Sequence, residues 1–143
     1  MNDLTIIALT CNDLPSHWEE YWQKTLLEAA NGLPIISFSM KPMDLGRNYL
    51  QNRPKSMSNI YLQILRGAWM ATTKYIGIAE SDTLYCNEHF LHQPKPNTFA
   101  YNMSHWSIYT WTNVDNPVPT YSWRNRRGNY SMICERSLAI EAL

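Results

Sequence analysis

Short apolar runs alternate with amphipathic stretches through the first half of the chain. Residues 4–10, 34–40 and 75–79 are apolar runs of strand length, and turn-forming or polar residues bound them. Between them, residues 16–30 and 58–72 repeat apolar side chains at helical spacing. The pattern predicts strand, helix, strand, loop, helix and strand. This alternation favours a parallel sheet with crossover helices.

Polar residues set the expected limits of these elements. Ser16, with Glu19 three residues later, has the spacing of a capping box, and Asn31-Gly32 supplies a helix stop. Residues 41–55 are polar and contain Gly46 and two prolines, so we expect a loop there. The inner face of the second helix is expected to carry Ile60, Ile64, Leu65, Ala68, Trp69 and Thr72.

The second half of the chain has a less regular pattern. Residues 97–101 and 107–112 are expected to be short aromatic strands, and residues 131–143 a final helix. Residues 113–128 follow no regular period. Because 143 residues contain no repeat and no linker, we expect a single domain, residues 1–143.

Composition and charge exclude several classes. Apolar residues make up 45% and charged residues 17%, which is typical of a globular protein. Twelve Lys and Arg balance twelve Asp and Glu, so we expect no nucleic acid polymer as partner. An apolar run of about 18 residues is absent, so no membrane span is expected. Three cysteines without a C-x-x-C pair, and no signal-peptide pattern, predict a cytoplasmic protein.

Two acids follow the third predicted strand. Ligands of open α/β sheets bind outside the carboxyl ends of the strands, and Glu80 and Asp82 lie at such an end. Separated by one residue, both carboxylates can converge on a hard divalent cation, Mn²⁺ or Mg²⁺, which could bridge a diphosphate. The alternative is that the acid pair only caps a turn.

This region resembles a known enzyme family. Residues 75–82, Tyr-Ile-Gly-Ile-Ala-Glu-Ser-Asp, resemble the strand and DxD segment of family-2-type glycosyltransferases, and residues 6–13 resemble their first strand and nucleotide loop. Residues 58–71 resemble the helix before DxD, and residues 80–90 are similar to a subgroup that reads E-x-D-x-L-Y and then x-H-F. The resemblance implies a GT-A fold, a Rossmann-like sandwich with a mainly parallel central sheet. It spans about residues 4–92.

The resemblance also implies roles for single residues. Asp82 would be the main metal ligand, Glu80 would touch the metal or ribose, and Ser81 would belong to the diphosphate site. The nucleotide contacts would be Thr10, Asn12, Asp13 and Asn59. His89 follows the acid pair closely, so it could reach the metal, although a lone histidine is more often structural.

A general base is expected among the late acids, because family-2-type enzymes carry it well after DxD. The candidates are Glu135 and Asp115, and Glu135 is preferred because it is expected at the start of the final helix. A glutamate at that position is also a common partner of the helix dipole. The arginines at 124, 126 and 127 suit diphosphate oxygens, and Trp106 or Trp123 could stack on a sugar. The alternative is a solvated basic loop with aromatic anchors.

The expected activity is therefore transfer of a sugar from a nucleotide-diphosphate donor to the hydroxyl of a glycan, lipid or small-molecule acceptor, with inversion. Residues 1–92 would form the nucleotide-binding half and residues 93–143 the acceptor-side half. A nucleotide- or sugar-binding module without turnover is one alternative, and an unrelated α/β interaction protein is another. Since 143 residues is short for a GT-A domain, the chain is expected to be either truncated or a minimal enzyme.

Overall fold

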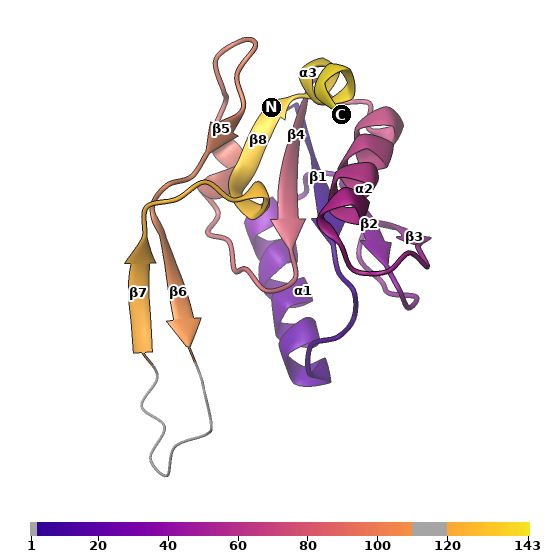
Figure 1. Cartoon of the computed structure of the whole chain (residues 1–143), viewed down its shortest axis with the longest axis vertical. Helices are drawn as coiled ribbons and strands as arrows, with labels where there is room; N and C mark the ends of the chain where they lie inside the picture. The colour runs from indigo at the N-terminus through magenta and orange to yellow at the C-terminus, as the bar shows by residue number, and fades with distance from the viewer. Residues whose placement is uncertain (1–2, 110–119) are drawn as a thin grey trace.

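A mixed, mostly parallel sheet forms the centre of this α/β protein (Figure 1). The computed structural model describes residues 3–109 and 120–143. The sheet has the strand order β3-β2-β1-β4-β8-β5, and the first four strands run parallel. Their bounds are β1 Leu4–Leu9, β2 Ile35–Ser39, β3 Arg47–Leu50 and β4 Tyr75–Glu80.

The last two strands of the sheet reverse its direction. β8 (Met132–Glu135) runs antiparallel to β4, and β5 (Ala100–Tyr101) runs antiparallel to β8. A separate two-stranded hairpin consists of β6 (His105–Tyr109) and β7 (Thr120–Arg124). In Figure 1 this hairpin extends away from the sheet. The expectation of a mainly parallel sheet is confirmed.

Helices cover both faces of the sheet. Leu4, Ile6 and Ala8 of β1 pack with residues of α1 (Ser16–Ala30) and with the short helix η1 (His89–Leu91). Ile7 and Leu9, whose side chains point to the other face, pack with α2 (Met57–Met70) and α3 (Arg136–Ala142). Because β1 and β4 are buried on both faces, their sequences are mostly apolar, with Thr5 in β1 and the terminal Glu80 of β4 as the polar exceptions.

The strand order changes direction between β1 and β4. From β1 the chain passes through α1 to β2, and it later returns through α2 to β4 on the other side of β1. α2 lies close to β1 because Gly67 faces Ile7, where a Cβ atom would come within 2.7 Å of the Ile7 Cδ1 atom. Such a switch point leaves a crevice outside the carboxyl ends of the two strands.

Several expected elements differ from the structure. The expected loop at 41–55 contains β3, and the expected final helix is strand β8 followed by α3, because Ile133 and Cys134 are buried between β4 and β5. Of the expected strand at 97–101 only Ala100–Tyr101 pairs. The second aromatic strand begins at His105, and residues 110–112 lie outside the described residues.

Two details of the expected helices are wrong. Pro15 takes the N-cap position of α1, without a side-chain cap, and the Glu19 carboxylate instead accepts a hydrogen bond from the Asn12 amide nitrogen (3.3 Å). Trp69 is 66% exposed and lies off the inner face of α2. The expected stop is confirmed, since Asn31 adopts the left-handed conformation and donates to the Leu27 carbonyl.

None of the helices in the described part of the chain is long and apolar enough to cross a membrane.

Candidate functional site

A pocket of about 200 Å³ lies at the switch point between β1 and β4. The carboxyl ends of both strands, the turn after β3 and the first turns of α2 form its walls. All of its lining residues fall between Leu9 and Asp82. The structure brings six of the predicted site residues to this pocket: Thr10, Asp13, Asn59, Glu80, Ser81 and Asp82.

The acid pair occupies the end of β4. Glu80 is the last residue of the strand and is half-buried, whereas Asp82 is exposed in the turn that follows. Burial, and then the neighbouring Asp82 charge, raise the pKa of Glu80 to about 7. The Thr83 hydroxyl donates to Asp82 Oδ1 at 3.1 Å. Because the two negative charges repel each other, a bound cation would be favoured here.

A tyrosine holds the backbone at the end of β4. β8 pairs only with Tyr75–Gly77, so the sheet leaves the N–H of Glu80 without a partner on that side. This N–H donates to the Tyr85 hydroxyl at 2.9 Å, and the hydroxyl donates in turn to the Tyr130 carbonyl at 2.9 Å. Burial of Tyr85 raises its pKa, so the hydroxyl stays neutral. Tyr85 therefore positions Glu80 without touching the pocket itself.

One lysine, Lys55, lies among the acidic residues of the pocket. Lys55 Nζ lies 2.9 Å from Asp13 Oδ2 in an ion pair whose side chains are both exposed. It is the one basic residue lining the pocket in the described part of the chain. The ion pair lowers the pKa of Asp13 and raises that of Lys55, and the Asp82 charge adds to the latter effect. Lys55 thus interacts electrostatically with both Asp13 and Asp82.

Buried amides form one wall of the pocket. Arg66 donates to Gln63 Oε1 (2.9 Å), Gln63 Nε2 donates to Asn59 Oδ1 (2.8 Å), and Asn59 Nδ2 donates to Gln51 Oε1 (3.1 Å). The guanidinium of Arg66 has only donors, so it sets the direction of every amide in this series. The wall is therefore rigid and polar beside the apolar side chains of Phe38 and Ile60.

Asn12 does not line the pocket, contrary to the sequence prediction. Its backbone is left-handed, with φ of 52°, and its Oδ1 atom accepts hydrogen bonds from the Met40 and Lys41 N–H groups, both at 2.9 Å. Its Nδ2 atom donates to Glu19. The Asn12 side chain thus joins the loop after β1 to the loop after β2 and to α1, and its role is to shape the pocket from behind.

His89 is also away from the pocket. It is buried in η1, beside the Tyr85 ring (5.2 Å between centroids) and edge-on to Phe90 (4.8 Å). Burial lowers its pKa to about 4, so the ring is neutral at pH 7. Within residues 3–109 and 120–143, no three His, Cys, Asp or Glu side chains are grouped to hold a metal ion. The structure therefore does not bring His89 together with Glu80 and Asp82, as a shared metal site would require.

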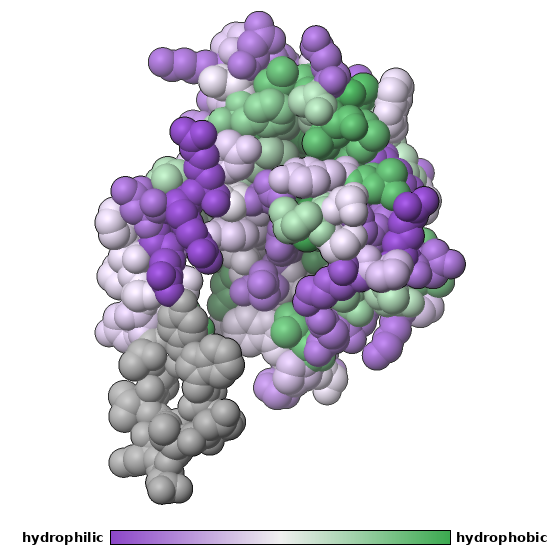
Figure 2. All heavy atoms as spheres, in the orientation of Figure 1, coloured by the Kyte–Doolittle hydropathy of each residue, from purple (hydrophilic) through white to green (hydrophobic). Residues whose placement is uncertain are grey.

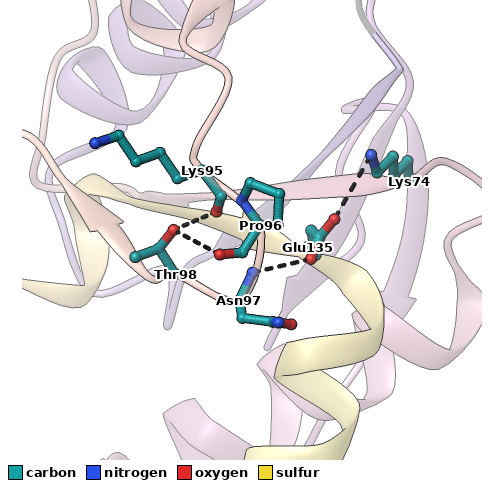
Figure 3. Close-up of polar contacts among 6 residues, drawn as sticks. All are labelled: Lys74, Lys95, Pro96, Asn97, Thr98 and Glu135. Atoms are coloured by element: carbon teal, nitrogen blue, oxygen red, sulfur yellow. Dashed lines mark hydrogen bonds and ion pairs between the residues drawn. The ribbon is translucent and has the colours of Figure 1, made fainter.

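Glu135 lies at the opposite edge of the sheet. It pairs in register with Tyr75, the first residue of β4, whereas Glu80 is the last. Five residues of strand place the two glutamates roughly 16 Å apart. Glu135 Oε1 lies 3.6 Å from Lys74 Nζ, and Glu135 Oε2 accepts a hydrogen bond from the Asn97 N–H at 3.2 Å (Figure 3). The structure therefore does not bring Glu135 to this pocket, because β8 runs antiparallel to β4 and ends beside the first residue of β4.

The remaining candidates lie elsewhere. Asp115 is outside the described residues. Arg127 lines a separate shallow hollow with Phe99, Tyr101 and their neighbours, and the arginines do not line the pocket at the acid pair. Trp106 and Trp123 are exposed on the hairpin.

The donor set at the acid pair fits a hard divalent cation. No hydrogen-bond donor of the described residues reaches the Glu80 carboxylate, and Asp82 accepts only from Thr83. Mg²⁺ and similar ions are often held by one or two carboxylates, with water and substrate phosphates as the other ligands. Glu80 and Asp82 would supply those two carboxylates.

Sequence reasoning missed Lys55, Gln51 and Gln63. Lys55 and Gln51 lie in the segment expected to be a plain loop, and Gln63 stands one residue before the apolar Ile64. The Ser56 N-cap of α2, whose hydroxyl accepts from the Asn59 N–H, was a readable signal. It marks where the loop turns into the helix and thus which residues border the pocket.

Comparison with known proteins assigns no family to this chain: no family model matches it, and no curated protein matches it significantly.

Proposed function

We propose that this protein is a metal-dependent, GT-A-type glycosyltransferase that binds a nucleotide-diphosphate sugar in the pocket between β1 and β4. The observation that carries the proposal is the acid pair: two carboxylates that repel each other at the carboxyl end of β4, in a pocket at the topological switch point. The resemblance of residues 75–82 to a strand and DxD segment agrees with this position.

The pocket residues divide into two groups in this proposal. Asp82 and Glu80 would hold Mn²⁺ or Mg²⁺, which supplies charge neutralisation of the diphosphate leaving group. Lys55 adds a positive charge at the same place, released from Asp13 when a phosphate competes for it. Thr10, Phe38, Gln51 and Asn59, which line the same pocket, would border the nucleoside.

The acceptor hydroxyl needs a base, and the described residues offer the pocket only Asp13, Glu80 and Asp82 as carboxylates. The position of Glu135 at the far edge of the sheet favours a second candidate function. In that case the domain would bind a nucleotide or its sugar without turnover. The two functions share the pocket and differ in whether the sugar bond breaks.

Binding is tested by thermal unfolding with Mn²⁺ and a panel of nucleoside diphosphates. A ligand at 100 times its dissociation constant adds about 2.7 kcal/mol to the free energy of unfolding, which we expect as a clear rise in Tm. Asp82→Asn should abolish the metal-dependent part of the rise. Asp44→Asn is the matched control, because Asp44 is exposed and does not line the pocket, and it should respond like the wild type.

A panel without any metal-dependent rise would refute both the enzyme and the binding module. Equal rises in Asp82→Asn and wild type would show that the acid pair is structural. Where binding occurs, release of free sugar from nucleotide sugars separates the two functions. The glycosyltransferase should release sugar slowly and lose this activity in Asp82→Asn, whereas the binding module should release none.

A further inference from the structure

The β6–β7 hairpin exposes its apolar face and turns its polar face inward. Trp106 and Ile108 alternate with polar residues along β6, and Tyr121 and Trp123 do so along β7. The register pairs Trp106 with Trp123 and Ile108 with Tyr121, so these four side chains share one face. They are 53–70% exposed. Antiparallel strands of globular domains normally show the reverse arrangement.

Contacts to the body of the domain hold the hairpin in this orientation. The opposite face carries His105, Ser107, Ser122 and Arg124, all half-buried. The His105 Nε2 atom and the Tyr130 hydroxyl form a 2.7 Å hydrogen bond, and the ring of His105 meets that of Tyr130 edge-on. A simple turn of the hairpin to bury its apolar face would break these contacts.

The exposed rings form a continuous surface. Trp106 and Tyr121, which are diagonal neighbours, meet edge-on with 5.8 Å between their centroids. Ile108 extends this surface beside Tyr121. A two-stranded hairpin is marginally stable in water, and an apolar surface of this kind usually marks an interaction site.

Positively charged residues follow the hairpin along the chain. β7 ends at Arg124, and the exposed Arg126 and Arg127 come two and three residues later. Strongly hydrophilic side chains gather over the upper end of the hairpin in Figure 2. Residues 93–134 contain Lys95 and three arginines against Asp115 as their only acid, although the whole chain has no net charge. The hairpin region therefore favours a partner with negative charge.

We propose that the outward face of the β6–β7 hairpin inserts into the interface of a membrane that carries anionic lipids. Tryptophan and tyrosine favour the headgroup level, where the ring is in a nonpolar layer and its polar atom in a wet one. Ile108 would enter the acyl boundary, and Arg126 and Arg127 would meet the lipid phosphates.

Three other kinds of partner fit the face less well. Single-stranded nucleic acid and sugar chains stack on flat rings, and Ile108, one of the four residues of the face, offers none. A second copy of the chain would bring two sets of arginines together across a two-fold axis, which charge repulsion disfavours.

Vesicle binding tests the proposal with the full chain. We expect cosedimentation with vesicles of equal parts phosphatidylglycerol and phosphatidylcholine, and at least tenfold weaker binding to pure phosphatidylcholine. Arg126→Gln with Arg127→Gln should weaken binding to the anionic vesicles about 30-fold, since each basic residue near the surface contributes about fivefold. Arg53→Gln, an exposed arginine outside the hairpin, is the matched control and should bind like the wild type.

A second pair of variants tests the rings. Trp106→Ser with Trp123→Ser should weaken vesicle binding at least tenfold and remove a blue shift of tryptophan emission. Trp69→Ser changes an equally exposed ring on α2 and should do neither. An unchanged circular dichroism spectrum and a cooperative thermal unfolding transition would show that the domain still folds.

Three outcomes would overturn the membrane proposal. These are equal binding of the wild type to neutral and anionic vesicles, full binding by the tryptophan pair variant, and a dimer in light scattering that the tryptophan pair variant dissociates. A fourth outcome concerns competition. If single-stranded RNA or oligosaccharides release the protein from vesicles at a lower concentration than soluble phosphatidylglycerol does, the face binds those ligands instead. The test does not depend on the glycosyltransferase proposal, because it uses no nucleotide.

Discussion

The half-buried carboxyl group of Glu80 should make the stability of this protein depend on pH. Its pKa is raised to about 7 in the folded chain, above the ordinary value of 4.5. Below pH 4.5 both the folded and the unfolded chain carry the proton, so no stability is lost there. Between pH 4.5 and about 7 the unfolded chain has lost the proton and the folded chain retains it, so the free energy of unfolding falls as pH rises; above pH 7 both are ionised and the loss is complete.

We therefore expect wild type, without divalent cations, to lose on the order of 2 kcal/mol relative to Glu80→Gln between pH 5 and pH 8, allowing for solvent screening. Urea unfolding at a series of pH values measures this difference. Glu20→Gln, an exposed glutamate on α1, should follow the wild type. Mn²⁺ should remove the loss, because a bound cation favours the ionised carboxylate. Parallel pH profiles of wild type and Glu80→Gln would contradict the assignment.

Gly67 determines how closely α2 approaches β1, and hence where Asn59 and Gln63 stand in the pocket wall. Gly67→Ala would place a Cβ atom 2.7–2.9 Å from three atoms of the Ile7 side chain. Such overpacking costs about 1–3 kcal/mol, which outweighs the higher helix propensity of alanine of about 1 kcal/mol. We expect a lower free energy of unfolding in urea and weaker nucleotide stabilisation.

A second substitution separates this clash from other causes. Ile7→Ala removes all three of these side-chain atoms, and alone it should cost about 2–5 kcal/mol. In the Gly67→Ala background it should cost less, because the missing atoms make room for the new Cβ. Additive losses in the double variant would show that Gly67 matters for another reason.

Elements buried on both faces were readable from the sequence, and edge elements were not. β1, β2, β4 and the two long helices show their apolar runs plainly. β3 is an edge strand with polar residues such as Arg47 and Asn48, so its sequence resembles a loop. β8 is a four-residue apolar run beside a helix, and periodicity does not separate a short buried strand from a helix.

The pocket residues were likewise predictable only where a buried strand marks their position. Glu80 and Asp82 were found because a carboxyl strand end is visible in a sequence. Lys55 and Gln51 reach the pocket only through the path of the loop between β3 and α2, which no local pattern encodes. Glu135 was misplaced because the direction of β8 decides which edge of the sheet its last residue occupies, and direction follows from tertiary pairing.

Three hydrogen bonds connect the end of β4, at the pocket, to the start of the β6–β7 hairpin. They run from the N–H of Glu80 through Tyr85 to the carbonyl of Tyr130, whose own hydroxyl meets His105 at the start of β6. Tyr85→Phe keeps the ring beside Phe90 and removes the two hydrogen bonds of the hydroxyl. The buried N–H of Glu80 would then lack an acceptor.

We expect Tyr85→Phe to lower the free energy of unfolding by about 1–3 kcal/mol. Hydrogen exchange should accelerate at the Glu80 amide and in residues 129–131, and remain unchanged in α1. Tyr61→Phe removes the hydroxyl of a 40%-exposed ring on α2 and serves as control, with little change expected. Unaltered exchange at Glu80 would show that the hydroxyl does not hold the strand end.

The pocket is lined entirely by residues between Leu9 and Asp82, and the exposed hairpin lies entirely after them. Evolution can therefore change the two parts separately. Substitutions in the hairpin strands alter the proposed membrane-binding face and leave the pocket lining untouched. Substitutions among the lining residues alter the proposed nucleotide pocket without changing that face. Among descendants of this chain, the two proposed binding surfaces can thus diverge at different rates.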